Sequence, residues 1–198
     1  MMIRNSGHLD RREAVKTLLA GRGDLLVVTG LGSSSYDVFD AGEDAGNFYL
    51  WGAMGGAAMV GLGLALAQPK RPVAVITGDG EQLMGLGSLM TIGAKRPGNL
   101  SIVVLDNGHF GETGMQMSHS GLGAKLELVA TAAGFPSVDE IFDLDAVAAY
   151  RGKLRDLEAG PRFARLHIST NHVDRALPPR DGVYLKNRFR QHLGLAVS

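Results

Sequence analysis

The stretch that most constrains the fold spans residues 72–116 and reads as a strand, a glycine turn, a helix and a second strand. Residues 73–77 and 100–105 are short apolar runs rich in β-branched side chains, which is typical of buried strands. Between them, residues 82–95 carry apolar side chains at helical spacing, and Pro97-Gly98 ends that helix. Two parallel strands joined by a helix end at the same edge of a sheet. We therefore expect the residues that follow these two strands to be neighbours in space.

Asp79 and Asn107 each stand just past the end of one of these predicted strands. The Asp79 carboxylate, the Asn107 amide and the backbone carbonyl of His109 together offer three oxygens. Mg²⁺ takes six oxygen ligands and usually shares them between protein and substrate phosphates. The backbone N–H groups that open the helix, where phosphate is attracted, belong to Gly80, Glu81 and Gln82. The pattern predicts a site for Mg²⁺ and a diphosphate.

Gly78-Asp79-Gly80, followed by an apolar helix and a strand that ends in Asp106-Asn107, resembles the cofactor motif of thiamin diphosphate-dependent enzymes. In that family the second part of the motif is an asparagine pair. Asp106 therefore stands in the first place of the pair, and Asn107 in the metal-binding place. The pair, followed by Thr113-Gly114-Met115-Gln116, is similar to the sulfopyruvate and phosphonopyruvate decarboxylase branch. The resemblance covers roughly residues 12–189 and implies thiamin diphosphate and Mg²⁺ as cofactors.

A second stretch, residues 48–55, resembles the element that precedes a glycine-rich helix in the same family. The resemblance implies that the Gly52 carbonyl receives the amino group of the cofactor's aminopyrimidine ring. It also implies that the Met54 side chain wedges beneath the cofactor, although a methionine here could simply fill the core. Trp51 either lines the same pocket or fills an interface.

The glycine-serine turn at residues 30–35 follows a predicted strand at residues 25–29. Such a turn often binds phosphate, whereas a serine at its end, Ser33 or Ser34, could merely cap the next helix. The family resemblance implies contact with the diphosphate. Glu81 departs from the small or hydroxyl residue expected after the motif, and a carboxylate aimed at diphosphate would repel it. Glu81 therefore either points away, into solvent or another contact, or weakens cofactor binding.

The loop after Asn107 is expected to lie over the diphosphate and to face the opening of the active site. Its polar residues His109, Gln116 and His119 are the candidates for contact with substrate, and a histidine here could act as a general acid. An ordinary surface position is the alternative for each. The full set of predicted cofactor-binding residues is Gly30, Ser33, Gly52, Met54, Gly78, Gly80, Glu81, Gln82, Asn107, His109 and Phe110, and the predicted metal ligands are Asp79, Asn107 and His109.

The rest of the chain alternates strand and helix signals, which predicts a doubly wound α/β fold with a mainly parallel, six-stranded sheet and helices on both faces. Residues 10–20 form a predicted helix capped by Asp10. Residues 37–44 read as a solvated acidic loop. Residues 53–67 read as a buried helix that is apolar all round, too short for the roughly 20 residues of a membrane span. Further predicted elements are helices at 36–39, 123–133, 144–157 and 186–193, a strand at 163–168 and a loop at 171–179.

Length and composition narrow the function. The 198 residues suffice for one domain, taken as residues 1–198, and the formal net charge of zero argues against nucleic acid or an anionic membrane as the main partner. There is no cysteine, so disulfides and thiolate metal sites are excluded. The first 14 residues are too polar for a signal peptide, which favours a cytoplasmic protein.

In the family that the chain resembles, a glutamate from a pyrimidine-binding domain activates the cofactor. The chain has length for the diphosphate-binding half alone, so the resemblance implies a second subunit that carries the other half, in an α₂β₂ or larger hetero-oligomer. The implied reaction is decarboxylation of a small 2-oxo acid with a sulfonate or phosphonate group, giving an aldehyde and CO₂. The alternatives are a carboligating, acetolactate synthase-like subunit and a non-catalytic partner that keeps the fold for assembly or regulation.

Overall fold

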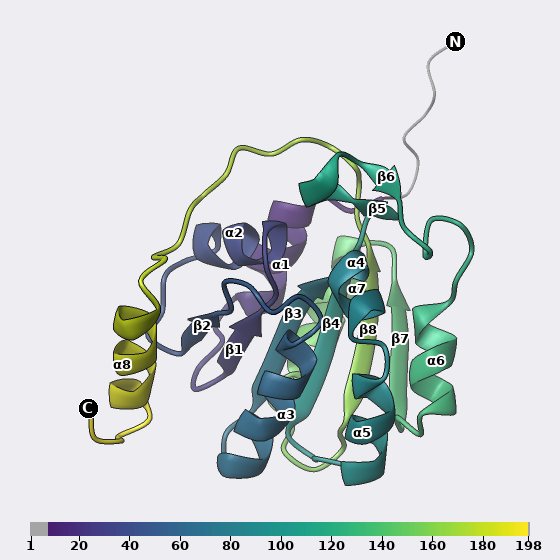
Figure 1. Ribbon diagram of the computed structural model, residues 1–198. Helices are drawn as coiled ribbons and strands as arrows, with labels where there is room; N and C mark the ends of the chain where they lie inside the picture. The colour runs from purple at the N-terminus through teal and green to yellow at the C-terminus, as the bar shows by residue number, and fades with distance from the viewer. Residues whose placement is uncertain (1–7, 198) are drawn as a thin grey trace.

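The computed structural model describes residues 8–197, so most of the polar segment before the first helix lies outside the described residues. Within this range a six-stranded parallel sheet has the order β2-β1-β3-β4-β8-β7, as Figure 1 shows. Its strands are β1 (Leu26–Thr29), β2 (Asn47–Tyr49), β3 (Val73–Gly78), β4 (Leu100–Asp106), β7 (Ser137–Ile141) and β8 (Arg162–His167). A two-stranded hairpin, β5 (His109–Phe110) and β6 (Gln116–Met117), stands above the sheet with the 3-10 turn η1 (Gly111–Thr113) between its strands. The predicted doubly wound fold is confirmed.

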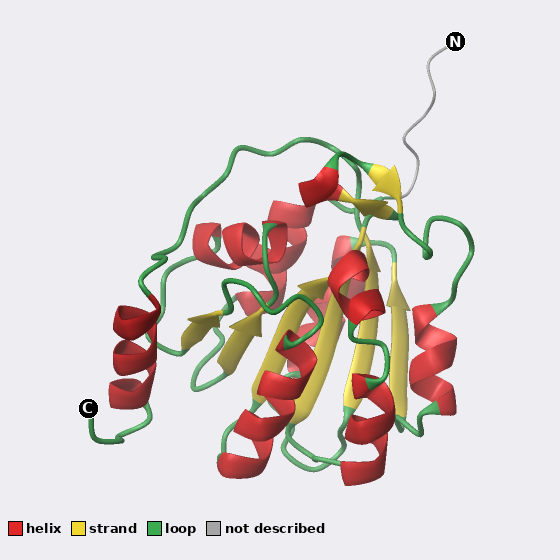
Figure 2. Cartoon of the chain, in the orientation of Figure 1, coloured by secondary structure: helices red, strands yellow, loops and turns green. Residues whose placement is uncertain are grey.

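Helices cover both faces of the sheet (Figure 2). One face carries α1 (Arg11–Leu19), α2 (Ser33–Asp40) and α7 (Leu144–Lys153), which pack around one apolar cluster. The other carries α3 (Ala57–Ala67), α5 (Ser88–Lys95) and α6 (Leu126–Ala132), around a second cluster that Phe189 of α8 (Gly182–His192) also joins. The short helix α4 (Asp79–Met84) begins where β3 ends. No helix among residues 8–197 is both long and apolar enough to cross a membrane.

The first helix forms as predicted. The Asp10 side chain accepts hydrogen bonds from the backbone N–H groups of Arg12 and Glu13, at 2.9 and 3.0 Å. Such a cap satisfies donors that have no partner inside the helix. The residues predicted to face inward, Ala14, Val15, Leu18 and Leu19, are all buried.

The continuous helix predicted for residues 82–95 is wrong. The segment forms two helices, α4 and α5, with a break at Gly85-Leu86-Gly87. A Cβ on Gly85 would lie 2.1 Å from the carbonyl oxygen of Gly55, so the chain at Gly85 touches the loop before α3. Apolar periodicity does not report this tertiary contact, and it places the Gly55 loop directly beside α4.

The helix predicted for residues 53–67 begins four residues late and is not buried all round. Its inner side is buried, and a Cβ on Gly61 would lie 2.2 Å from the Val75 side chain, so this glycine permits close packing on β3. Met59, Val60 and Leu66 on its outer side are 43%, 37% and 53% exposed. Helix α3 therefore presents an apolar face that the described chain does not cover.

Two further predictions near β1 are wrong. Residues 37–40 belong to α2 rather than to a solvated loop, and Asp37 is buried against Arg11 and Arg12. Ser33 and Ser34 do not cap α2, because Gly32 stands at the cap position and the Ser34 hydroxyl donates to the Gly30 carbonyl oxygen. The edge strands β2 and β7 lie where the sequence indicated no separate strand, since both are short and β7 carries charged residues.

Candidate active site

A cavity of about 90 Å³ lies at the carboxyl ends of β3 and β4. Its floor is the β3–α4 turn, and the loop after β4, the loop before α3 and the start of α1 form its walls. The predicted site residues that line it are Ser33, Met54, Gly78, Asp79, Gly80, Glu81, Asn107, His109 and Phe110. The two loop tips predicted to meet are therefore brought together around one cavity, because β3 and β4 are adjacent and parallel.

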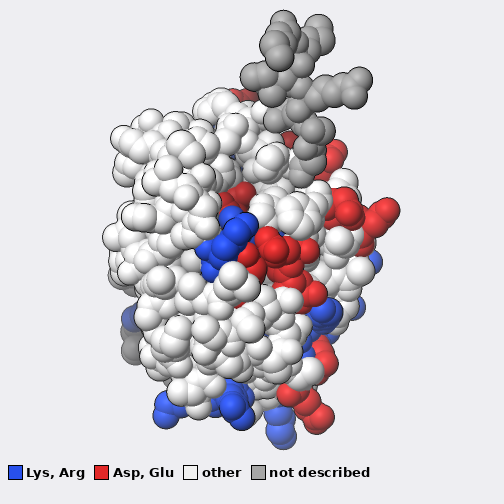
Figure 3. Space-filling model, turned by 90° about the vertical axis from the view of Figure 1, so that its right-hand side faces the viewer, with Lys and Arg blue, Asp and Glu red and all other residues white. Residues whose placement is uncertain are grey.

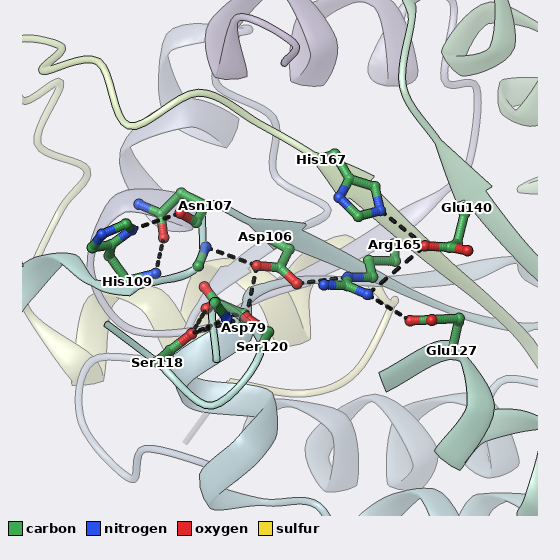
Figure 4. Close-up of polar contacts among 12 residues, drawn as sticks. Asp79, Asp106, Asn107, His109, Ser118, Ser120, Glu127, Glu140, Arg165 and His167 are labelled. Carbon is green, nitrogen blue, oxygen red and sulfur yellow. Dashed lines mark hydrogen bonds and ion pairs between the residues drawn. The ribbon is translucent and has the colours of Figure 1, made fainter. Parts of the chain in front are cut away.

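Asp79 is 2% exposed, and two hydroxyl groups hold its Oδ2 atom. Ser118 and Ser120 both place their Oγ atoms in hydrogen-bonding contact with this oxygen, Ser120 at 2.9 Å (Figure 4). Burial raises the pKa of Asp79, the hydroxyl of Ser118 lowers it, the neighbouring Asp106 carboxylate raises it, and the net shift is upward. A bound cation would reverse this shift, because a nearby positive charge favours the ionised carboxylate.

Asn107 and His109 fix each other through two hydrogen bonds. The Asn107 amide oxygen accepts from the His109 backbone N–H at 2.9 Å, and the Nδ1 atom of His109 lies 2.8 Å from the Asn107 carbonyl oxygen. Gly108 between them has φ +71°, a conformation that favours glycine. The turn after β4 thus holds an amide oxygen and an imidazole beside the cavity.

The segment that carries Ser118 and Ser120 reaches Asp79 because two glycines touch. A Cβ on Gly121 would lie 2.4 Å from the carbonyl oxygen of Gly108, so neither position tolerates a larger residue without a backbone shift. The backbone N–H of Ser118 also donates to the Gly108 carbonyl oxygen at 2.8 Å. The sequence analysis missed both serines, since their role depends on this contact and on no local motif.

Asp106, which stands in the first place of the asparagine pair, is buried in an ion network (Figure 4). Its Oδ2 atom accepts from Nε of Arg165 at 2.6 Å, and its Oδ1 atom lies 2.8 Å from the Ser120 hydroxyl. Arg165 also contacts Glu127 at 2.7 Å and lies 3.7 Å from Glu140. The sequence analysis missed Arg165, although a charged residue inside the apolar strand β8 was the available signal.

Glu81 lines the cavity, and its carboxylate is held by hydrogen bonds within the chain. Its Oε2 atom accepts from the Thr77 hydroxyl at 2.7 Å and its Oε1 atom from the Ala57 backbone N–H at 3.3 Å. A Cβ on Gly30 would lie 1.4 Å from Oε2, so the glycine makes room for this carboxylate. Burial raises the pKa of Glu81 above its ordinary 4.5, and the bond from Thr77 only partly offsets that effect. Glu81 is 5% exposed, so of the predicted alternatives it takes the internal contact rather than solvent.

Met54 borders the cavity from a loop with unusual backbone geometry. Gly52, Ala53 and Gly55 all have positive φ, at 100°, 50° and 87°. The Met54 side chain is 38% exposed, so it is not an ordinary core methionine. Trp51 turns away, donating from Nε1 to the Pro179 carbonyl oxygen at 2.8 Å, and so fills an intramolecular contact.

Five predicted site residues do not line the cavity. The carbonyl of Gly30 accepts the Ser35 hydroxyl at 2.7 Å, and the Gln82 side chain lies 3.4 Å from Ser88. Gln116 is exposed and donates to the Thr113 carbonyl oxygen at 2.9 Å. The His119 ring packs edge-on against Phe110, with centroids 6.4 Å apart, so it stands behind a cavity residue. The fifth residue is Gly52, in the loop beside Met54.

The donor set fits a cation that shares its ligands with a phosphate group. Residues 8–197 contain no cluster of three or more His, Cys, Asp or Glu side chains able to hold a metal by themselves. One carboxylate and one amide oxygen beside a glycine turn match the way Mg²⁺ binds together with phosphates. A Cβ on Gly78 would meet nothing within 4 Å, so open space borders the turn where a ligand would lie.

The fold and this site define an α/β domain with a glycine-bordered cavity, lined in part by polar side chains, at the carboxyl edge of a parallel sheet. Residues 33–156 match the family described as thiamine pyrophosphate enzyme, C-terminal TPP binding domain, where TPP is another name for thiamin diphosphate. The chain belongs to this family, and the resemblance based on the Gly78-Asp79-Gly80 motif is confirmed.

Two relatives agree with this family assignment, and two solved structures share the fold. The chain is 35% identical over 181 residues to sulfopyruvate decarboxylase subunit beta of Methanothermobacter thermautotrophicus, covering 91% of this chain and 94% of that protein. It is 45% identical over 172 residues to phosphonopyruvate decarboxylase of Streptomyces viridochromogenes, covering 86% of this chain and 43% of that protein.

Benzoylformate decarboxylase of Polynucleobacter necessarius superposes with a TM-score of 0.70 at 16% identity, over 88% of this chain and 36% of that one. The thiamine diphosphate-dependent 4-hydroxybenzoylformate decarboxylase of Rhodococcus jostii gives 0.68 at 18% identity, over 86% and 34%. At these identities the superpositions concern the fold alone.

Proposed function

We propose that this chain is the diphosphate-binding subunit of a thiamin diphosphate-dependent 2-oxo acid decarboxylase, with a sulfopyruvate-like substrate. The observation that carries the proposal is the single cavity that Asp79, Asn107 and Met54 share at the ends of β3 and β4. The chain's sequence similarity to a sulfopyruvate decarboxylase subunit, over 94% of that subunit, supports the substrate class. The 45% identity to a phosphonopyruvate decarboxylase favours the phosphonate analogue as the second candidate.

Each wall of the cavity has a role in this proposal. Asp79, Asn107 and the carbonyl of His109 hold Mg²⁺, and the first backbone N–H groups of α4 receive the diphosphate. Gly52 and Met54 meet the aminopyrimidine side. When bound, thiamin diphosphate supplies an electron sink for the pair released as CO₂ departs. Ser118 and Ser120 fix the orientation of the Asp79 carboxylate.

His109 is the group placed to move a proton. The Asn107 carbonyl oxygen can only accept, so the proton of a neutral His109 ring lies on Nδ1. That leaves Nε2 as the atom that can take up or deliver a proton at the cavity. Gln116, in β6 of the hairpin, and His119, which packs against Phe110, stay candidates for contact with substrate.

A partner subunit completes the proposal. The outer face of α3 is apolar, and all six methionines in the described range are at least 38% exposed. Methionine is enriched at protein interfaces, and large exposed apolar patches mark interaction sites. We take the partner to carry the pyrimidine-binding domain with its activating glutamate, in a cytoplasmic hetero-oligomer. In contrast, acidic and basic side chains are mixed on the β7–α6 side of the molecule (Figure 3).

The test titrates thiamin diphosphate and Mg²⁺ into the chain with its partner and follows CO₂ release from sulfopyruvate and phosphonopyruvate. Asp79→Ala is expected to weaken Mg²⁺ activation by more than about 100-fold, because a direct ligand matters at least as much as its supporting shell. Asp145→Ala, at an exposed aspartate of α7, is the matched control. Unchanged Mg²⁺ dependence in Asp79→Ala would remove the metal assignment, and release of a carboligation product without aldehyde would favour the acetolactate synthase-like alternative. A complex that binds neither cofactor would support the non-catalytic role.

A further inference from the structure

A second cavity, of about 190 Å³, adjoins the first on the α1–α2 side of the sheet edge. The two cavities share five lining residues, which are Arg11, Ser33, Asn107, Gly111 and Glu112. The proposed cofactor site uses the β3–α4 turn, the loop after β4 and the Met54 loop. Arg11 lies on α1, an element that carries none of the proposed metal or diphosphate ligands.

Arg11 is held in place by a buried carboxylate. Its Nε and Nη2 atoms both contact Oδ2 of Asp37 at 2.7 Å. The Asp37 side chain is 2% exposed and that of Arg11 is 12% exposed. Burial raises the pKa of Asp37, and the charge of Arg11 lowers it by less. A buried aspartate of this kind fixes the guanidinium plane through Nε and Nη2, so Nη1 is the remaining guanidinium nitrogen of Arg11, a residue that lines both cavities.

The neighbouring Arg12 is arranged differently, although it shares the same aspartate. Its Nε atom contacts Oδ1 of Asp37 at 2.8 Å. Its Nη1 atom pairs with Asp40 and its Nη2 atom donates to the Asp174 carbonyl oxygen. All three Arg12 nitrogens are thus occupied by the protein. The other charged pair at the cavities, Arg175 and Glu112, is 3.6 Å apart, and Glu112 also accepts from Ser33.

We propose that Arg11 binds the second acidic group of the substrate, the sulfonate or phosphonate that stays on the product after CO₂ departs. The inference rests on the proposed function and adds the residue that reads the substrate class. Arg presents a planar set of donors that matches a tetrahedral oxyanion, and an oxyanion in a low-dielectric cavity is bound more strongly than in water. Leu105 and Ile168, which also line the first cavity, supply the apolar wall beside it.

The retained acidic group, and not the departing carboxylate, is the partner that suits a decarboxylase. A cation that pairs with the departing carboxylate loses its partner as neutral CO₂ forms, so it would stabilise the ground state over the transition state. A cation that pairs with the retained group keeps this contact throughout the reaction. Such a contact raises kcat/KM for acidic substrates without opposing the bond cleavage.

The test compares wild type and Arg11→Met in the complex with the partner, loaded with thiamin diphosphate and Mg²⁺. For sulfopyruvate, kcat/KM is expected to fall on the order of 100-fold, because a charged hydrogen-bonded pair is truncated. For pyruvate, which has no second acidic group, it is expected to change by less than about threefold. The inhibition constant of 3-sulfopropanoate, an inert sulfonate, should rise in parallel with the loss on sulfopyruvate.

Arg12→Met is the matched control, since it removes the other arginine from Asp37 and is expected to leave the ratio of the two substrates unchanged. An equal loss on sulfopyruvate and pyruvate in Arg11→Met would overturn the inference. Weaker thiamin diphosphate binding in Arg11→Met, with an unchanged preference between the two substrates, would also overturn it, because Arg11 would then bind the diphosphate. A wild-type complex that binds no thiamin diphosphate would instead refute the proposed function itself, so the two failures are distinguishable.

Discussion

The ion network beside Asp79 gives the sharpest test of how this chain compensates a buried charge. Arg165 is 4% exposed and is the cation shared by Asp106 and Glu127, which are 4% and 7% exposed. Replacing Arg165 with methionine keeps an apolar stem of similar length but removes the charge. The buried carboxylates of Asp106 and Glu127 then have no cation between them at position 165.

The contacts set the size of the effect. Removing one partner of a buried ion pair costs about 3–5 kcal/mol, because the remaining charge is desolvated and unpaired. We expect Arg165→Met to lower the free energy of unfolding by about 4 kcal/mol. Asp106→Asn keeps one acceptor oxygen, which can face Arg165, and its NH2 group can donate to the Ser120 hydroxyl, while Glu127 still compensates Arg165 at 2.7 Å. We expect this second variant to cost only about 1–2 kcal/mol.

The double variant decides whether the reasoning is right. In Arg165→Met/Asp106→Asn one of the two uncompensated carboxylates is gone, so the double variant should be more stable than Arg165→Met alone, by about 1–2 kcal/mol. Urea unfolding followed by the fluorescence of Trp51, the single tryptophan of the chain, measures all three variants against wild type. Additive losses, or a loss below about 1 kcal/mol for Arg165→Met, would refute the charge-compensation argument.

Two other predictions concern Glu81 and the outer face of α3. Since burial raises the pKa of Glu81, the stability contributed by its neutral form is present below pH 4.5 and is lost as the pH rises through the raised value. Glu81→Gln should therefore gain stability relative to wild type as the pH rises above 4.5, and a difference that is constant from pH 4 to 8 in urea unfolding would contradict this. Met59→Glu should weaken association with the partner subunit by more than about tenfold in calorimetric titration while the stability of the chain changes by less than about 0.5 kcal/mol. Lys70→Glu, at an exposed position in the turn after α3, is its control, and equal affinities of the two variants would exclude α3 from the interface.

Much of the fold follows from local pattern, and the exceptions are tertiary. Of the four strands named from sequence, β1, β3 and β4 are apolar runs typical of buried strands, and β8 is an apolar run interrupted by Arg165 and His167. All four were predictable within a residue or two. The break at Gly85 was not, because only the approach of Gly55 requires it. The outer face of α3 was predicted to be buried for a related reason. The sequence shows that a residue is apolar, but it does not show whether this chain or a partner covers it.

The site divides in the same way. Asp79 and Asn107 could be predicted to meet, because parallel strands end at one edge and each residue directly follows a strand. Ser118 could not, since it reaches the site through a loop contact. Arg165 stands out as a charged residue inside a buried strand, but its contact with Asp106 depends on β8 lying next to β4. Asp37 was predicted as a solvated residue because it opens the acidic, glycine-containing stretch at residues 37–44, whereas its neighbours in space are two arginines.

The aspartate in the first place of the asparagine pair is explained by these contacts in space. An extra carboxylate this close to Asp79 repels the charge that Asp79 needs in order to bind a cation. In this chain Arg165 contacts that carboxylate at 2.6 Å, and the Ser120 hydroxyl lies between it and Asp79, at 2.8 and 2.9 Å. Arg165 lies on β8, the strand next to β4. Its positive charge offsets the negative charge that Asp106 brings in place of an asparagine. If Asp79 holds Mg²⁺ as proposed, a chain with Asp106 but without the arginine at position 165 is expected to bind Mg²⁺ less tightly, because the Asp79 carboxylate would then face an unbalanced negative charge.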